Sequence, residues 1–186
     1  RVSFTGDLGW EIYVKTENQL KLYEALLDTG ADLGVRPVGG RSLLSLRVEK
    51  GYGSWGREYS PEYWPQEVGL ERLIKLDKPD FLGKEAYLKI KDLKPRERLV
   101  VLEVNADQDA DPVGGEPVFL KDGTPVGRVT SGAYGYTCDK SLAICMIETD
   151  YAVSGNEFHV AVIGQNHEAV MLAEPPFDPL GTRLRA

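Results

Sequence analysis

The chain has 186 residues, and its 22 Lys and Arg residues against 29 Asp and Glu residues give a formal net charge of −7. A hydrophobic share of 42% with 27% charged residues is ordinary for a globular protein and excludes intrinsic disorder. No run approaches the roughly 18 apolar residues of a membrane span, and the acidic balance disfavours binding to a nucleic-acid backbone. We therefore expect no membrane and no nucleic acid as partner, although a local basic pocket for a small anion stays open.

The first thirty residues predict a hairpin followed by a helix. Strand-like residues Val2–Phe4 and Trp10–Val14 flank a glycine-containing turn. Thr16 and Gln19 have the spacing of a capping box, and apolar residues then recur at helical spacing up to Gly30, which we expect to end the helix in a left-handed conformation. This order is typical of an α+β domain. Because the chain starts with Arg1 in the middle of the expected hairpin, we also expect an N-terminal part to precede it.

A second helix is expected over Arg41–Lys50, ended by Gly51. The stretch that follows, up to Gly69, is rich in glycine, proline and aromatic residues without clear periodicity, which indicates a functional or tightly packed segment. We expect a strand over Leu70–Leu76 and a short helix over Gly83–Lys91.

The composition changes near residue 92, where a polar, proline-containing segment predicts a domain boundary. After it the chain reads as strands and turns without helices, which favours a small antiparallel β-barrel. The expected strands are Leu99–Val104, Pro117–Leu120, Val126–Thr130, Leu142–Ile147, Glu157–Ile163 and Ala169–Leu172.

Motifs for nucleophilic or metal-dependent catalysis are not found. The sequence has no G-x-S-x-G motif, and His159 and His167 lie in or beside expected late strands with no third metal ligand in view. Cys138 and Cys145 give no metal-binding pattern and fit structural thiols in a reducing, cytoplasmic compartment. We expect no metal site.

Glu11 is the acid with the most informative position. It alternates with Trp10 and Ile12, so on a strand it points to the opposite face. That face is either solvent or a cleft in which the carboxylate accepts two N–H donors from a heterocycle while Phe4 stacks on the ring. Periodicity alone favours the solvated surface.

Basic residues recur between positions 36 and 57. Two explanations stay open at this point: a solvated charged helix face, or capture of a ligand tail that carries carboxylates. The residues are Arg36, Arg41, Arg47, Lys50 and Arg57.

Several motifs in order resemble the glycine-cleavage T-protein family of folate-dependent aminomethyltransferases. The segment at residues 4–14 reads FTGDLGWEIYV and resembles the family's Y/F-T-G-E-x-G-x-E-I. The L-R-x-E-x-G stretch matches SLRVEKG, and LDKPDFLGKEA and GEPVFLKDGTPVGRVTSGAYGYT follow in the right order. The features EKGY with W-G, LDKPDFLGKEA and the ending PPFDPLGTRLRA look most like the C-terminal folate-binding regions of sarcosine and dimethylglycine dehydrogenases.

The resemblance implies tetrahydrofolate as the one-carbon acceptor and a small-molecule iminium or aminomethyl donor. The family's pterin-binding Glu falls on Glu11, and its Tyr falls on Phe4, which keeps the ring and loses the hydroxyl. The family's folate-contacting Arg falls on Leu43, and Arg41, two residues earlier, is the substitute we consider. The catalytic Asp of the family belongs upstream of Arg1, so we expect this chain alone to be inactive, and any FAD domain would also lie upstream.

We therefore predict an α+β fold in which residues 1–92 are the C-terminal portion of a folate-binding aminomethyltransferase-like domain and residues 93–186 form the β-barrel domain. The expected function is tetrahydrofolate-dependent one-carbon transfer in a sarcosine or dimethylglycine dehydrogenase-like protein. Three alternatives stay open: a free-standing aminomethyltransferase or demethylase, a non-catalytic folate-binding module, and a structural barrel with no ligand.

Overall fold

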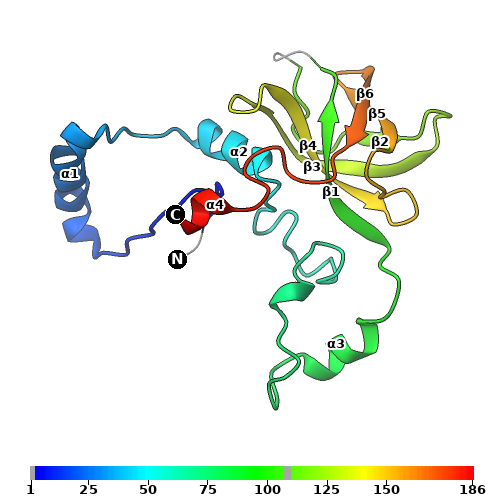
Figure 1. Cartoon of the computed structure of the whole chain (residues 1–186), viewed down its shortest axis with the longest axis horizontal. Helices are drawn as coiled ribbons and strands as arrows, with labels where there is room; N and C mark the ends of the chain where they lie inside the picture. The colour runs from blue at the N-terminus through cyan, green and yellow to red at the C-terminus, as the bar shows by residue number, and fades with distance from the viewer. Residues whose placement is uncertain (1–2, 107–109) are drawn as a thin grey trace.

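A computed structural model describes residues 3–106 and 110–186. Figure 1 shows an N-terminal part of helices and irregular segments, a C-terminal barrel, and a chain end that returns to the N-terminal segment. The N-terminal part contains α1 (Gln19–Gly30), α2 (Gly40–Glu49) and α3 (Lys84–Ile90), with 3-10 turns at Thr16–Asn18, Ala31–Leu33 and Glu71–Leu73, and α4 (Thr182–Arg185) follows the barrel. No helix in the described ranges is long and apolar enough to cross a membrane.

The barrel is closed and antiparallel, and within the described residues its strand order is β1-β4-β3-β2-β5-β6. Each of the six barrel strands expected from the sequence is found, although the third continues to Gly135 and the sixth begins at Gln165. The predicted α+β fold with a C-terminal barrel is confirmed. The strands are β1 (Glu97–Val104), β2 (Pro117–Phe119), β3 (Pro125–Gly135), β4 (Lys140–Glu148), β5 (Glu157–Val162) and β6 (Gln165–Met171).

Apolar side chains of β4 pack on both faces of their strand. Ala143, Cys145 and Ile147 belong to the barrel core, while Leu142 and Ile144 point the other way and pack with Val48 of α2. A strand with both faces buried reads as a continuous apolar run, as seen here. The second contact fixes α2 against the outside of the barrel, and α2 ends before the left-handed Gly51 (φ 67°) as predicted.

One edge of β1 has a strand partner over only part of its length. β6 pairs with Leu102–Val104, whereas β4 pairs with the whole strand on the other side. Backbone groups from two loops cover the remaining edge: the Leu99 N–H donates to the carbonyl of Glu67 at 2.7 Å, and the Leu172 N–H donates to the carbonyl of Val101 at 2.9 Å. The edge is therefore hydrogen-bonded without a strand.

Part of the aromatic-rich segment 51–69 is packed against the rest of the fold. This agrees in part with the prediction of a tightly packed segment. Buried Glu67 accepts the backbone N–H of Trp64 at 2.7 Å and the Nε–H of Arg96, just before β1, at 2.9 Å. The hydroxyl of Tyr63 accepts a hydrogen bond from Arg128 of β3 at 2.9 Å. Only part of the segment is buried, since Trp55 is 90% exposed.

The predicted N-terminal hairpin is wrong for residues 3–15, which form no strand, and Val2 lies outside the described residues. The Ser3 hydroxyl instead accepts the N–H of Gly6 at 2.8 Å and donates to the carbonyl of Asp7 at 2.7 Å, which makes a tight turn. An isolated two-stranded hairpin is marginally stable, so side-chain hydrogen bonds within the turn can replace it.

Three other local predictions are also wrong. Gly30 has φ −87° and the chain continues into a 3-10 turn, so the left-handed residue is Gly34 (φ 76°). Position 30 needs a glycine for a different reason: a Cβ there would lie 2.3 Å from a methyl group of Val35. Thr16 opens a 3-10 turn without a side-chain cap, and the expected strand Leu70–Leu76 contains a 3-10 turn instead.

Candidate functional site

Phe4 lies in the Ser3–Asp7 turn and rests on α2. Its ring centroid is 5.8 Å from the guanidinium carbon of Arg47, and the side chain remains 38% exposed. A cation under one part of an aromatic ring stabilises its position and leaves the rest of the ring accessible. The turn therefore presents an aromatic surface to solvent at the end of α2.

Arg47 is almost fully buried and is neutralised by Glu58. Its Nη1 lies 3.4 Å from the Oε2 of Glu58 and donates to the carbonyl of Tyr52 at 2.7 Å. Glu58 has no exposed surface and also accepts the backbone N–H of Ser54 at 2.7 Å and the hydroxyl of Ser131 in β3. The pair joins α2, the segment after it, and the barrel.

The pKa of Glu58 reflects a balance between burial and its partners. Burial opposes ionisation, but the hydrogen bonds from Ser131 and Ser54 and the charge of Arg47 outweigh it, so the pKa lies below its ordinary value. Burial also lowers the pKa of Arg47, and the charge of Glu58 opposes that shift. The pair is therefore ionised at neutral pH.

Glu11 lies in the irregular segment between the Ser3–Asp7 turn and α1. Its Oε2 accepts the hydroxyl of Tyr13 at 2.6 Å, and this hydrogen bond together with the negative charge raises the pKa of Tyr13. Glu11 forms no ion pair with any residue in the described ranges. The carboxylate is exposed, so it keeps lone pairs for further donors.

An open apolar hollow lies beside Glu11. It has a volume of about 820 Å³ and lies between the segment before α1 and α1 itself. Its lining is strongly exposed, with Trp10 at 77% and Tyr13 at 87%. Exposed apolar surface of this kind is typical of ligand grooves and protein–protein contacts, which makes the hollow a candidate binding surface. The lining is completed by Ile12, Val14, Thr16, Gln19, Leu20, Leu22, Tyr23 and Leu26.

Of the three residues predicted to bind folate, the structure links only Phe4 to another part of the fold. Arg41 is exposed in the first turn of α2, and Leu43 is exposed on the same helix. Within the described part of the chain no hydrogen bond, ion pair or ring contact joins Phe4, Glu11 and Arg41. The three remain predictions on separate elements.

Neither explanation proposed for the basic cluster fits all of its members. Arg36, Arg41 and Arg57 are exposed, but Arg47 and Lys50 are buried and paired with acids. The acid partners, Glu58 and Asp178, were missed, and nothing in their local sequence distinguishes them from surface acids. The one available signal is the spacing of Arg47 and Lys50, which brings both onto one side of α2 with Val48 between them.

Within the described residues the thiols form no disulfide, and the potential metal ligands do not cluster. Cys138 and Cys145 are both free, and burial raises the pKa of Cys145 well above its ordinary value. In residues 3–106 and 110–186 no three His, Cys, Asp or Glu side chains gather where they could hold a metal ion.

A helical N-terminal part followed by a closed six-stranded antiparallel barrel defines the class of fold to which the chain belongs. Family comparison is consistent with this: residues 1–78 match the GCVT N-terminal domain, and residues 97–178 match the glycine cleavage T-protein C-terminal barrel domain. The chain belongs to the glycine cleavage T-protein family.

The chain is similar to a dehydrogenase, an oxidase and an aminomethyltransferase. The chain is 40% identical to dimethylglycine dehydrogenase, mitochondrial, of Mus musculus over 94% of its own length and 20% of the relative. It is 40% identical to 4-methylaminobutanoate oxidase (formaldehyde-forming) of Paenarthrobacter nicotinovorans over its whole length and 22% of that protein. An aminomethyltransferase of Symbiobacterium thermophilum is 36% identical over 95% of the chain and 46% of the relative.

A solved structure shows the same fold. The crystal structure of glycine cleavage system aminomethyltransferase T from Bartonella henselae superposes with a TM-score of 0.85 at 26% identity. The match covers 95% of this chain and 48% of that protein. The chain thus spans about a fifth of the dimethylglycine dehydrogenase and less than half of the aminomethyltransferases.

The buried pair gives a stability prediction. Glu58→Gln leaves the charge of Arg47 buried without a counter-charge, so we expect the free energy of unfolding to fall by about 3 kcal/mol. Urea denaturation of the two proteins at pH 7 measures this. Glu62→Gln, an exposed acid in the same segment, should change the value by less than about 0.5 kcal/mol. A loss below about 1 kcal/mol for Glu58→Gln would contradict the pairing.

Asp178 gives a pH prediction. Its hydrogen bond from the Thr182 hydroxyl, with backbone N–H donors and Lys50, lowers its pKa to about 2. A lowered pKa in the folded state adds stability above the ordinary pKa of an Asp, and this is lost as the pH falls toward 2. We expect wild type to exceed Asp178→Asn in urea resistance at pH 7, with the difference shrinking between about pH 4 and pH 2. A difference that stays constant over this pH range would contradict this assignment.

Proposed function

We propose that this chain is the tetrahydrofolate-binding region of a one-carbon transfer enzyme, with Glu11 and Phe4 contacting the pterin. The observation that carries the proposal is Glu11, an exposed carboxylate without a counter-charge in the described structure, beside the apolar hollow. The motif resemblance of residues 4–14 supports it, since it aligns Glu11 with the family's pterin-binding Glu. An acceptor-only group next to ring faces suits a flat heterocycle that has N–H donors on one edge.

The chemistry of the two side chains fits the pterin ring. A carboxylate can accept two parallel N–H donors, and the Tyr13 hydroxyl uses only one lone pair of Glu11. Phe4 offers a ring edge and face already held by Arg47. Exposed Arg41 has no partner in the described ranges and is free to meet a carboxylate on the folate tail.

Tetrahydrofolate supplies the amine that accepts the one-carbon unit. The residues of this chain bind and orient that amine, which lowers the entropy cost of its reaction with the donor. The group that promotes transfer is expected outside these residues, so we infer that the isolated chain does not turn over substrate.

Replacing the pterin acid tests the proposal. We expect Glu11→Gln in the full-length protein to weaken tetrahydrofolate binding by at least tenfold, because an amide nitrogen replaces one of the two acceptor oxygens. Isothermal titration calorimetry measures the dissociation constant. Glu17→Gln, an exposed acid six residues later, is the control and should bind as wild type. Equal affinity of Glu11→Gln and wild type would overturn the assignment.

The finer identity of the parent protein is a separate inference. Identity of 40% to a dimethylglycine dehydrogenase and to a 4-methylaminobutanoate oxidase, against 36% to an aminomethyltransferase, supports a flavoprotein parent. We infer that FAD is bound by another domain, while this region receives the one-carbon unit on tetrahydrofolate. No dinucleotide-binding motif lies within these residues.

The visible spectrum of the protein purified from its source distinguishes the candidates. We expect a flavin absorption spectrum and an intact mass several times 20.6 kDa. A colourless protein about twice this size would instead identify a free-standing aminomethyltransferase or demethylase.

One observation favours a second candidate, a folate-binding module without transfer activity. Phe4 and Leu43 both depart from the aminomethyltransferase pattern, and Leu43 replaces a folate-contacting Arg there. Such a module would bind tetrahydrofolate, and Glu11→Gln would weaken that binding. It would transfer no one-carbon unit to tetrahydrofolate in an assay with a one-carbon donor.

A further inference from the structure

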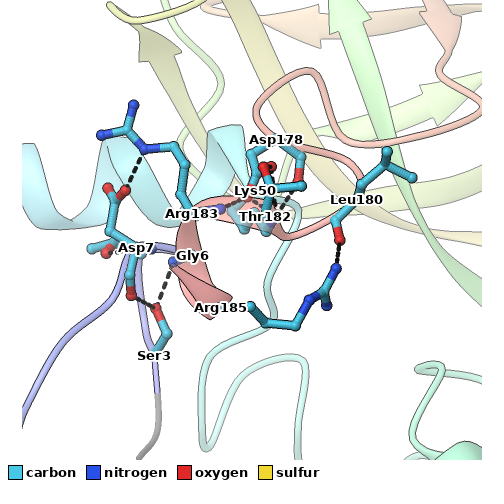
Figure 2. Close-up of polar contacts among 10 residues, drawn as sticks. Ser3, Gly6, Asp7, Lys50, Asp178, Leu180, Thr182, Arg183 and Arg185 are labelled. Carbon is cyan, nitrogen blue, oxygen red and sulfur yellow. Dashed lines mark hydrogen bonds and ion pairs between the residues drawn. The ribbon is translucent and has the colours of Figure 1, made fainter.

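We propose that the C-terminal segment, residues 177–183, positions the folate-contacting turn Ser3–Asp7, and we call this segment the C-terminal clamp. The inference rests on the proposed function, since it gives the clamp a role in holding Phe4 for the pterin. Figure 2 shows the contacts, which join residues 176 positions apart in the chain.

The first contact of the clamp is made by Arg183. Its Nε donates to the Oδ1 of Asp7 at 2.7 Å, and the two side chains are 62% and 35% exposed. Asp7 ends the turn in which the Ser3 hydroxyl bonds both Gly6 and Asp7. The contact between Arg183 and Asp7 therefore restrains the whole turn, including Phe4, which lies between Ser3 and Asp7.

The second contact passes through Lys50, at the end of α2. Its side chain is 4% exposed, and its Nζ donates to the backbone carbonyl of Asp178 and lies 3.5 Å from the carboxylate. The turn packs on the same side chain: a Cβ on Gly6, which has φ 88°, would lie 2.5 Å from the Lys50 carbon chain. Lys50 thus lies between the turn and the clamp and contacts both.

The clamp is itself rigidly built. The Asp178 carboxylate accepts the Thr182 N–H at 2.8 Å, the Thr182 hydroxyl at 2.6 Å and the Arg183 N–H at 3.1 Å, as the dashed lines of Figure 2 mark in part. The N–H of Phe177 donates to the carbonyl of Glu49 in α2 at 3.2 Å, and the Arg183 guanidinium lies 5.2 Å from the Phe177 ring. These contacts fix the direction of Arg183 toward Asp7.

The turn needs such support because it has no strand partner. Residues 3–15 form no regular element. Apart from its internal bonds, three contacts among the described residues hold the turn: Phe4 on Arg47, Gly6 on Lys50, and Asp7 on Arg183. Removing the exposed ion pair between Arg183 and Asp7 should make the position of the Phe4 ring less fixed. It should not unfold the protein, because exposed ion pairs contribute little to global stability. The expected effect is therefore on ligand affinity.

The test compares substitutions of two arginines of α4 in the full-length protein. Arg183→Gln removes the ion pair with Asp7 and the guanidinium contact with Phe177, whereas Asp7→Asn removes the ion pair and leaves the Phe177 contact. Arg185→Gln removes a bond to the Leu180 carbonyl within the same segment. We expect Arg183→Gln and Asp7→Asn each to raise the tetrahydrofolate dissociation constant about two- to fivefold, with the double variant no worse than Arg183→Gln, since both substitutions remove the same ion pair. Arg183→Lys should restore part of the affinity, and Arg185→Gln should match wild type at an unchanged melting temperature.

A second readout does not depend on folate. Hydrogen exchange at the amides of Gly6 and Asp7 should be faster in Arg183→Gln than in wild type and Arg185→Gln. If Arg183→Gln keeps wild-type affinity and exchange while Glu11→Gln loses binding, the clamp is wrong and the proposed function stands. If wild type does not bind tetrahydrofolate, the proposed function is wrong, and with it the folate role of the clamp. If the amides of Gly6 and Asp7 still exchange faster in Arg183→Gln in that case, the clamp holds the turn in place but has no role in binding folate.

Discussion

A guanidinium group buried between α2 and the barrel needs a carboxylate close by, because an uncompensated charge there costs several kcal/mol. Glu58 supplies it from the segment after α2, and the hydroxyl of Ser131 in β3 holds Glu58 in place. The register of β3 against β4 shifts between Val129 and Ser131, just where that contact is made. Since the same guanidinium lies under Phe4, the ion pair connects the barrel to the turn that we propose binds the pterin.

The parts of the fold that the sequence predicted well are those whose stability is local or periodic. The barrel strands have apolar alternation or continuous apolar runs, and α2 has helical spacing with Gly51 after its end. The predicted hairpin and the strand at Leu70–Leu76 failed because neither finds a pairing partner in this structure, and apolar alternation alone does not supply one. Gly30 was predicted from turn chemistry, whereas its size is required by Val35.

The candidate site divides in the same way. Glu11 and Phe4 could be singled out because a carboxylate and an aromatic ring suit a flat heterocycle, and because both positions match a family motif. The residues that hold Phe4 could not, because Arg47 with Glu58 and Lys50 with Asp178 are separated by 11 and 128 positions. Pairing over such distances depends on the path of the chain around the barrel. A charged residue in a helix looks the same in sequence whether it faces water or a buried carboxylate.

The partly unpaired edge of β1 bears on how the barrel behaves at high concentration. An open strand edge is a template on which a strand of another molecule can add, the usual start of edge-to-edge aggregation. Here the backbone groups of Leu99 and Val101 are already satisfied by Glu67 and Leu172 from the same chain. An incoming strand would first have to displace both loops. At this edge the Leu99 N–H and the Val101 carbonyl are therefore not available to a strand of another molecule.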